Sequence, residues 1–189
     1  MSTITENLNR YRASLPQGVE LCAVSKFHPE ASILEAYNVG QRVFGESRVQ
    51  ELVSKSQNLP KDIEWHFIGH LQTNKVKYIV PFISLIHSGD SIKLLKEINS
   101  CAKKEGRVID VLLQLHVAQE ETKSGFLPSE LYDYMATEEW RELKNIQLRG
   151  VMGMATFTDD ESLIESEFRQ IRKAFDDIKQ QYFPEDDKF

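Results

Sequence analysis

Short apolar segments alternate with amphipathic segments six times along this chain of 189 residues. The apolar segments are rich in Val, Ile, Leu and Phe, and the segments between them repeat apolar residues every three or four positions, as α-helices do. The predicted strands are residues 20–25, 42–45, 63–68, 82–87, 108–117 and 146–152. Such a strict succession predicts a parallel sheet covered by helices, in a single α/β domain spanning residues 1–189.

Two architectures fit this alternation, an open doubly wound sheet and a (β/α)₈ barrel. A dinucleotide-binding doubly wound sheet carries a glycine-rich turn after its first strand, whereas residues 25–28 read Ser-Lys-Phe-His. Most predicted strands end instead in polar residues, and sites built from the ends of many strands are typical of barrels. The sequence therefore favours a TIM barrel with about six βα units before Phe189. We expect the remaining strands to lie in a longer natural chain.

Helix signals punctuate the predicted strands. An amphipathic segment opens the chain. Ser47 stands where an N-cap is expected, and Asp90 or Ser91 is expected to cap a later helix. Pro29 suits the first turn of the second helix. A long apolar stripe over residues 160–182 predicts a helix with one solvated face.

Lys26 follows the first predicted strand directly. The unbroken apolar run at residues 21–24 predicts a strand that is buried on both faces. The carboxyl end of a parallel strand is where α/β folds place their chemistry. Two interpretations remain open at this point. Lys26 is either a surface residue where the strand meets solvent, or an amine kept neutral by apolar surroundings that reacts with an aldehyde.

Composition narrows the class of protein. The net charge is −6 and the basic residues form no run, which argues against a nucleic-acid groove or a membrane patch. The polar start and the short apolar runs predict neither a signal peptide nor a membrane span. Cys22 and Cys101 lie in apolar contexts and are interpreted as core residues in a reducing compartment. We expect a cytoplasmic protein.

Five sequence stretches carry a family resemblance. They are residues 23–26 (AVSK), 44–51 (FGESRVQE), 65–75 (WHFIGHLQTNK), 121–126 (ETKSGF) and 148–154 (LRGVMGM). In order and spacing they closely resemble the pyridoxal-phosphate homeostasis proteins over nearly the whole chain. The resemblance implies a single-domain barrel similar to the N-terminal domain of alanine racemase.

The resemblance also implies a cofactor and a role. Pyridoxal 5′-phosphate (PLP) forms a Schiff base with the lysine that ends strand one, which matches Lys26. We expect Ser47, His66 and Met154 to bind the cofactor, and Lys123 to act as a second lysine that receives or relays it. The family holds and delivers PLP in vitamin B6 homeostasis, and robust catalysis is not its established role. The implied partners are PLP and PLP-dependent apoenzymes, and we expect a monomer.

The chain departs from the family pattern at a few positions. Ser47 replaces a usual asparagine, Arg48 an aromatic residue, and His28 a second lysine. The family's serine- and glycine-rich loop after strand seven and its strand-eight segment hold the cofactor phosphate. Neither occurs before Phe189.

These residues also have other interpretations. Glu46 and Ser47 fit a helix cap equally well, and Lys123 fits a solvated loop residue. Arg149 and His87 are interpreted as structural residues. One alternative function is a PLP-dependent racemase-like enzyme, which needs a second acid/base that other racemases take from another domain. The other is a metal-dependent TIM-barrel hydrolase that uses three histidines, His66, His70 and His116.

Overall fold

Six parallel strands form one sheet in the computed structural model, which describes residues 3–120 and 124–189. The strands follow the order β1-β2-β3-β4-β5-β6, so each lies beside the next in sequence. Their bounds are β1 Ala23–Val24, β2 Val43–Glu46, β3 Glu64–Phe67, β4 Leu85–Gly89, β5 Ile109–Leu115 and β6 Ile146–Gly153. All pairings are parallel, which requires a crossover between each pair of strands.

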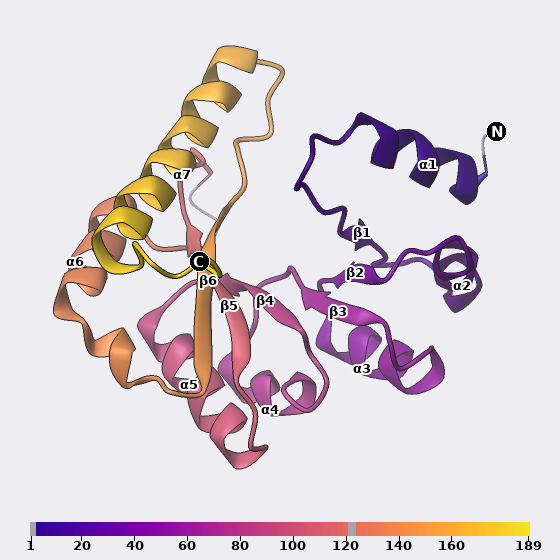
Figure 1. Cartoon of the computed structure of the whole chain (residues 1–189), viewed down its shortest axis with the longest axis horizontal. Helices are drawn as coiled ribbons and strands as arrows, with labels where there is room; N and C mark the ends of the chain where they lie inside the picture. Colours follow the sequence, from indigo (N-terminus) through magenta and orange to yellow (C-terminus); the bar gives the residue numbers. More distant parts are fainter. Residues whose placement is uncertain (1–2, 121–123) are drawn as a thin grey trace.

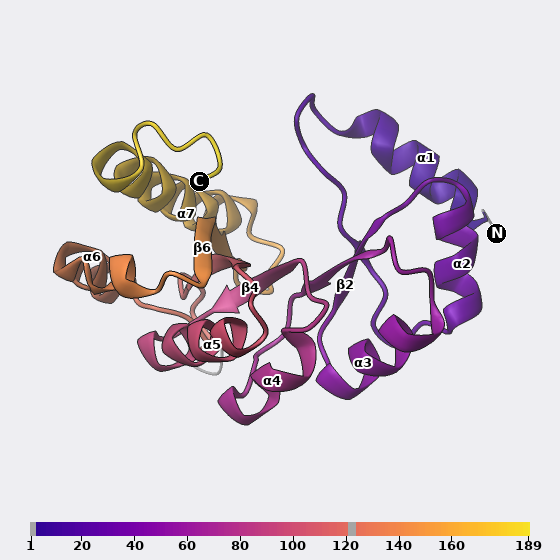
Figure 2. The same cartoon turned by 60° about the horizontal axis from the view of Figure 1, so that its bottom comes forward.

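Helices supply these crossovers and run round the outside of the sheet (Figure 1). They are α1 Ile4–Ser14, α2 Glu30–Asn38, α3 Val49–Asn58, α4 Val76–Ile79, α5 Ile92–Lys104, α6 Pro128–Thr137 and α7 Glu161–Tyr182, with short 3₁₀ turns η1 Thr73–Lys75 and η2 Glu139–Glu142. Helices α1 and α7 lie at the two ends of the row of strands, beside β1 and β6, in both views (Figure 1 and Figure 2). Among the described helices, none has an apolar stretch long enough to cross a bilayer.

The strand order confirms the barrel-type prediction. A doubly wound sheet reverses its strand order at a switch point, whereas the order here never reverses. Six successive βα units of a (β/α)₈ barrel give this arrangement. The sheet is open in the described chain, and β1 and β6 are its edges.

Buried and half-buried side chains alternate along the first four residues of β4, β5 and β6. Side chains that face the helices are fully buried, as Ile86, Val111 and Leu113 show with no exposed area. Residues on the opposite, inner face, such as Asp110 and Leu112, are only half-buried. The main core therefore lies between the sheet and its helices, and the inner face is only partly covered at Asp110 and Leu112.

The prediction that the first strand is buried on both faces is wrong. Val24 is 50% exposed, and the strand is limited to two residues. The physical reason is that β1 pairs only with β2 and forms an edge of the open sheet. The apolar residues of this run are therefore not all buried, because they lie at an edge of the sheet.

Two helix starts also differ from the prediction. Helix α3 begins at Val49 with Arg48 as its N-cap, so Ser47 is not the cap. Ser47 lies instead against Gly69, where an added Cβ would be 2.4 Å from the Ser47 carbonyl oxygen. Pro29 is the N-cap of α2 rather than part of its first turn. The prediction for α5 is confirmed, because Ser91 accepts a hydrogen bond from the Leu94 N–H at 3.3 Å.

Candidate functional site

The carboxyl ends of the six strands place a set of polar and functional residues along one edge of the sheet, here called the carboxyl edge. Parallel strands bring the residues that follow them to the same side. The residues that follow β1 to β6 in turn are Lys26, Ser47, His70, Asp90, Ser124 and Met154. Sequence reasoning expected this convergence, and the topology explains it.

Lys26 lies in a tight turn between β1 and α2, and its side chain is exposed. The turn begins where the Ser25 N–H donates to the Gly45 carbonyl at 2.9 Å, and it closes where the His28 N–H donates to the Ser25 carbonyl at 3.1 Å. Phe27 adopts a left-handed backbone conformation with φ of 66°. An aromatic residue rarely takes this conformation unless its surroundings hold it there.

Next to this turn lies a group of charges, here called the Lys55 ion group, formed by the buried Lys55 and Glu46 and the half-buried Glu51. The Lys55 ammonium donates to Glu46 Oε1 at 2.7 Å, to Glu51 Oε1 at 2.6 Å and to the Ser25 carbonyl at 2.9 Å. Lys55 is 5% exposed and Glu46 is fully buried. A buried ammonium that uses all three of its protons in this way is satisfied despite its burial.

The same ion group reaches the residues on both sides of Lys26. The Ser25 hydroxyl donates to Glu46 Oε1 at 2.7 Å, and the Phe27 N–H donates to Glu51 Oε1 at 2.8 Å. Burial raises the pKa of Glu51, but hydrogen bonds from Lys55 and the Phe27 N–H, with the charges of Lys55 and Arg48, outweigh it and lower the pKa below its ordinary value. Glu51 is therefore ionised at neutral pH.

His66 and His87 form a second buried group, on the inner face of the sheet. Nε2 of His87 lies 3.0 Å from Nδ1 of His66, across neighbouring strands β3 and β4. Burial lowers the pKa of both imidazoles to about 4, and for His66 the neighbouring His87 lowers it further. Both rings are neutral at physiological pH, so one donates a hydrogen bond to the other.

The three histidines of the hydrolase hypothesis do not converge. His66 pairs with His87, His70 contacts Asp90 and Ser124, and His116 contacts the Glu120 carbonyl. Within residues 3–120 and 124–189, no three His, Cys, Asp or Glu side chains are arranged to hold a metal ion. β3 ends at Phe67, and His70 lies in the loop that follows it.

The loop that carries Met154 is held by a buried carboxylate from α7. Glu167 is 2% exposed and accepts hydrogen bonds from the Thr156 N–H at 2.6 Å and the Thr156 hydroxyl at 2.7 Å. The Thr156 hydroxyl in turn accepts from the Gln119 N–H at 2.9 Å, which joins this loop to the loop after β5. Met154 itself is 46% exposed.

The remaining site predictions fall in separate places. Lys123 lies outside the described residues. Ser47 is half-buried at the end of β2. Arg149 pairs with Asp110 at 3.0 Å on the inner face of the sheet.

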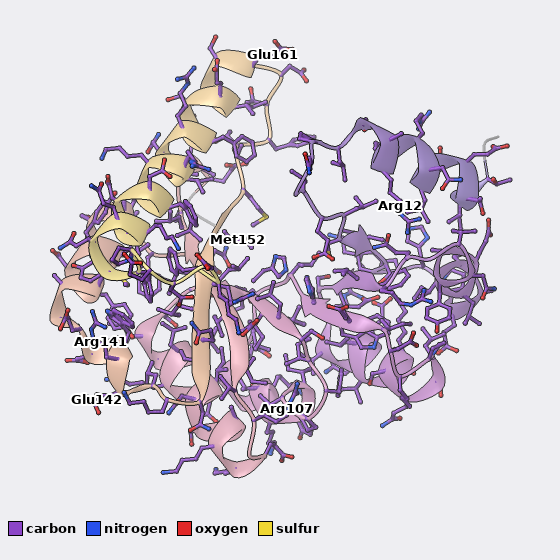
Figure 3. All side chains as sticks on the ribbon, in the orientation of Figure 1. Arg12, Arg107, Arg141, Glu142, Met152 and Glu161 are labelled. Atoms are coloured by element: carbon purple, nitrogen blue, oxygen red, sulfur yellow. The ribbon has the colours of Figure 1, made fainter. Side chains whose placement is uncertain are left out.

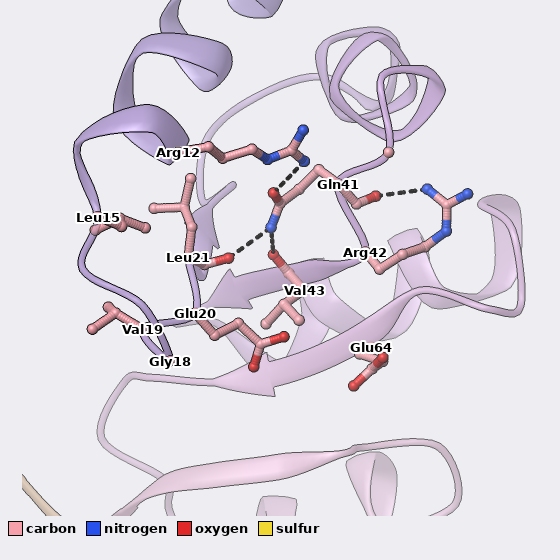
Figure 4. Close-up of a pocket in the computed structure, with 11 residues that line it drawn as sticks. Arg12, Leu15, Gly18, Val19, Glu20, Leu21, Gln41, Arg42, Val43 and Glu64 are labelled. Carbon is pink, nitrogen blue, oxygen red and sulfur yellow. Dashed lines mark hydrogen bonds between the residues drawn. The ribbon is translucent and has the colours of Figure 1, made fainter.

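A pocket of about 700 Å³ lies at the opposite edge of the sheet, at the amino-terminal ends of β1 to β3 (Figure 4). Arg12 and Gln41, two of its polar residues, bond to one another and to the backbone. Arg12 donates to Gln41 Oε1 at 2.8 Å, and the Gln41 amide donates to the Leu21 and Val43 carbonyls at 2.7 Å. A smaller pocket of about 150 Å³ adjoins the Lys26 turn and is lined in part by Ser25 and His28. Pocket size therefore does not identify the functional site.

The two edges are well separated along the strands. Figure 3 shows Arg107, just before β5, and Met152, near the end of β6, at opposite ends of the sheet. Arg107 donates to the Val80 and Ile83 carbonyls, which is a structural role. The chemistry-bearing side chains at the ends of the strands lie on the Met152 side.

Sequence reasoning missed the groups that support the site. Lys55 and Glu51 lie four residues apart on α3, a spacing that also occurs on solvated helix faces. Glu167 lies on a helix whose other charged residues are exposed or half-buried. The available signal was weak, because a charged residue at a core-facing helical position is recognised only when the buried face is known.

This chain is similar in sequence to proteins that are already known. The family described as alanine racemase, N-terminal domain, matches residues 1–187. A pyridoxal phosphate homeostasis protein of Aquifex aeolicus is 40% identical over 167 residues, which cover 86% of this chain and 71% of that protein. One from Pasteurella multocida is 35% identical over 188 residues, which cover 95% of this chain and 79% of that protein.

The chain belongs to the pyridoxal phosphate homeostasis protein family. Solved structures of the family agree with the fold. PipY of Synechococcus elongatus without PLP has a TM-score of 0.88 and 37% identity, over 95% of this chain and 83% of that one. PipY with PLP bound has a TM-score of 0.84 and 36% identity, over the same shares of the two chains. An alanine racemase of Clostridium difficile, at 18% identity and a TM-score of 0.71 over 93% of this chain and 47% of that one, shares the fold alone.

Proposed function

We propose that this protein binds PLP through a Schiff base on Lys26 and serves vitamin B6 homeostasis. One observation in the structure carries the proposal. Lys26 lies in the turn after β1 at the carboxyl edge, and the peptide groups on both sides of it are hydrogen-bonded to the Lys55 ion group. The family supports the identity of the ligand, since PipY has been solved with PLP bound and the curated relatives are named for PLP homeostasis.

The residues at this edge fit the aldehyde and the ring of PLP. Lys26 offers an exposed amine. His66 offers a neutral imidazole on the inner face, held by His87 and unprotonated above a pKa of about 4. Ser47 and Met154 follow β2 and β6 at the same edge. In this proposal Ser47 makes a polar contact with PLP and Met154 makes an apolar one.

The cofactor supplies an aldehyde when bound, and its condensation with an amine releases water and is reversible. The chain's own residues bind, orient and protect. The Lys55 ion group fixes the turn that carries the amine, and Glu167 fixes the loop that carries Met154. Storage of a reactive aldehyde on a protein amine keeps its free concentration low, which suits a homeostatic carrier.

The cellular side of the proposal is a cytoplasmic, monomeric carrier that passes PLP to PLP-dependent apoenzymes. Lys123 receives or relays the cofactor during transfer. Recovery of activity by an apoenzyme mixed with the loaded protein tests delivery, and Lys123→Ala is expected to slow that recovery without abolishing loading. Equal recovery rates for the Lys123→Ala variant and the unmodified chain would remove this role.

A spectroscopic titration tests the central claim of binding. PLP is added to the purified chain, and the imine absorbance is followed to saturation. Lys26→Ala is expected to give no imine signal, and Lys26→Arg serves as the matched control that keeps the positive charge but cannot form the bond. Lys75→Ala, on the 3₁₀ turn η1, controls for adventitious reaction at another lysine. A full imine signal in Lys26→Ala contradicts the proposal.

A further inference from the structure

We infer that Lys55 is a positioning residue, which acts through Glu46 and Glu51 to hold the backbone turn that presents Lys26. This inference rests on the proposed function for its purpose, and on the hydrogen bonds of the described residues for its geometry. It concerns no residue that touches the cofactor.

The geometry singles out the turn. The Lys55 ammonium donates to the Ser25 carbonyl, which belongs to the peptide group that joins Ser25 to Lys26. Glu51 accepts from the Phe27 N–H, which belongs to the peptide group that joins Lys26 to Phe27. Both peptide groups of Lys26 are thus bonded to one buried cluster, so the Cα of Lys26 is held from both sides.

The ion group is more than a packing device for α3. That helix already buries Val49 and Leu52 against the sheet, and Leu52 has no exposed area. A methionine at position 55 would bury similar apolar volume without the cost of desolvating an ammonium group. The charges are instead directed at the turn, where Phe27 has φ of 66° and needs a hydrogen bond to stay in that conformation.

The charges also depend on one another. Glu46 is fully buried, and its Oε2 has no hydrogen-bond partner among the described residues, so its charge is balanced chiefly by Lys55. Loss of Lys55 leaves Glu46 and Glu51 as two carboxylates with no buried cation between them. The expected consequence is a local rearrangement that releases the Ser25 and Phe27 peptide groups.

The test uses two readouts on the purified full chain. The first is hydrogen exchange of the Phe27 amide without cofactor, which reports the hydrogen bond to Glu51. The second is the rate at which the imine absorbance appears after PLP is added. Glu51→Ala removes the acceptor while leaving the Lys55–Glu46 pair, and Glu51→Gln is the conservative variant, because its amide oxygen still accepts from the Phe27 N–H. Lys55→Met tests the whole group.

We expect Phe27 exchange to accelerate about tenfold or more, and imine formation to slow about tenfold, in Glu51→Ala and Lys55→Met. Glu51→Gln is expected to recover most of both. Ile98→Val on α5 controls for general destabilisation, since Ile98 is fully buried away from the turn. If Lys55→Met does not fold, Glu51→Ala still decides the matter.

The outcomes separate this inference from the proposed function. Unchanged Phe27 exchange in Glu51→Ala overturns the inference whatever the cofactor does. Faster exchange with an unchanged rate of imine formation also overturns it, because the ion group would then be structural only. Absence of any imine in the unmodified chain refutes the proposed function, while the exchange data still report whether the turn is held.

Discussion

Nε2 of His87 and Nδ1 of His66 lie 3.0 Å apart, so strands β3 and β4 are joined on the inner face by a hydrogen bond between two neutral imidazoles. Burial lowers the pKa of each ring from 6.5 to about 4. Protonation of either ring would place a positive charge beside the other with little solvent to screen it. This pair is therefore a source of acid sensitivity.

The folded protein is expected to lose stability between pH 6.5 and about 4. In this window the unfolded chain takes up protons at His66 and His87, whose pKa values are about 6.5 when exposed, and the folded chain does not. The histidine contribution is fully present above pH 6.5. The free energy of unfolding then falls by up to about 1.4 kcal/mol per pH unit for each histidine. Urea unfolding at pH 7, 6 and 5 measures the slope.

A double substitution and a single control test whether His66 and His87 cause this dependence of stability on pH. His66→Gln with His87→Gln is expected to flatten the slope, because neither side chain titrates. His28→Gln is the control, since His28 is exposed in the turn after β1. A slope that survives the double substitution would assign the acid sensitivity to other groups.

Gly69→Ala is expected to disturb the end of β2. An added Cβ would lie 2.4 Å from the Ser47 carbonyl oxygen and 2.8 Å from its Cα, and backbone atoms cannot move aside as a flexible side chain does. We expect a loss of about 1–3 kcal/mol of unfolding free energy, together with weaker PLP binding. Thermal unfolding and the PLP titration measure the two effects.

Gly106→Ala is the control for that substitution. Gly106 has φ of 64°, and a Cβ there meets no atom within 4 Å, so only backbone strain changes. Its expected cost is about 1 kcal/mol, with PLP binding unaffected. Equal PLP affinity for Gly69→Ala and Gly106→Ala would show that Ser47 does not contribute to the site.

Glu167→Ala is expected to release the loop after β6. The Thr156 N–H and hydroxyl both lose their acceptor, and a buried donor left unpaired costs about 1–3 kcal/mol. Hydrogen exchange of residues 154–158 measures the release. Glu165→Ala, which breaks only an exposed pair with Arg169, is expected to cost less than about 1 kcal/mol and to leave exchange in this loop unchanged.

Substitutions at Phe27 test the strain in the turn. Phe27→Val is expected to destabilise the protein by about 1–2 kcal/mol, because a β-branched residue tolerates φ of 66° poorly. Phe27→Asn is expected to be close to neutral, because asparagine adopts the left-handed conformation more readily. Both variants also lose the contact between the Phe27 ring and the Arg48 guanidinium, which lies 4.6 Å from the ring centre, so this loss does not affect the comparison. Equal stability of the two variants would argue against a left-handed residue at this position.

Most of the fold was predictable from local pattern. The helical stripes of α5 and α7 and the N-cap at Ser91 follow from rules that act within a few residues. The succession of strands and helices predicted the parallel sheet, and the polar ends of the strands predicted the edge at which Lys26 lies. Those inferences need no knowledge of distant contacts.

The predictions that were wrong or missing depended on contacts between segments far apart in the sequence. Val24 is exposed because β1 is a sheet edge, and Ser47 is not a cap because Gly69 of the next unit packs against it. The His66–His87 pair and the reach of Lys55 to the Ser25 carbonyl span 21 and 30 positions in sequence. No periodicity encodes such pairings, so they emerge only when the sheet register is known.

The residue to which PLP becomes attached can be measured directly. The loaded protein is reduced with borohydride and digested, and the modified peptide is identified by mass spectrometry. We expect one stoichiometric adduct on Lys26, absent in Lys26→Arg. A stoichiometric adduct on another lysine, with Lys26 unmodified, would contradict this expectation.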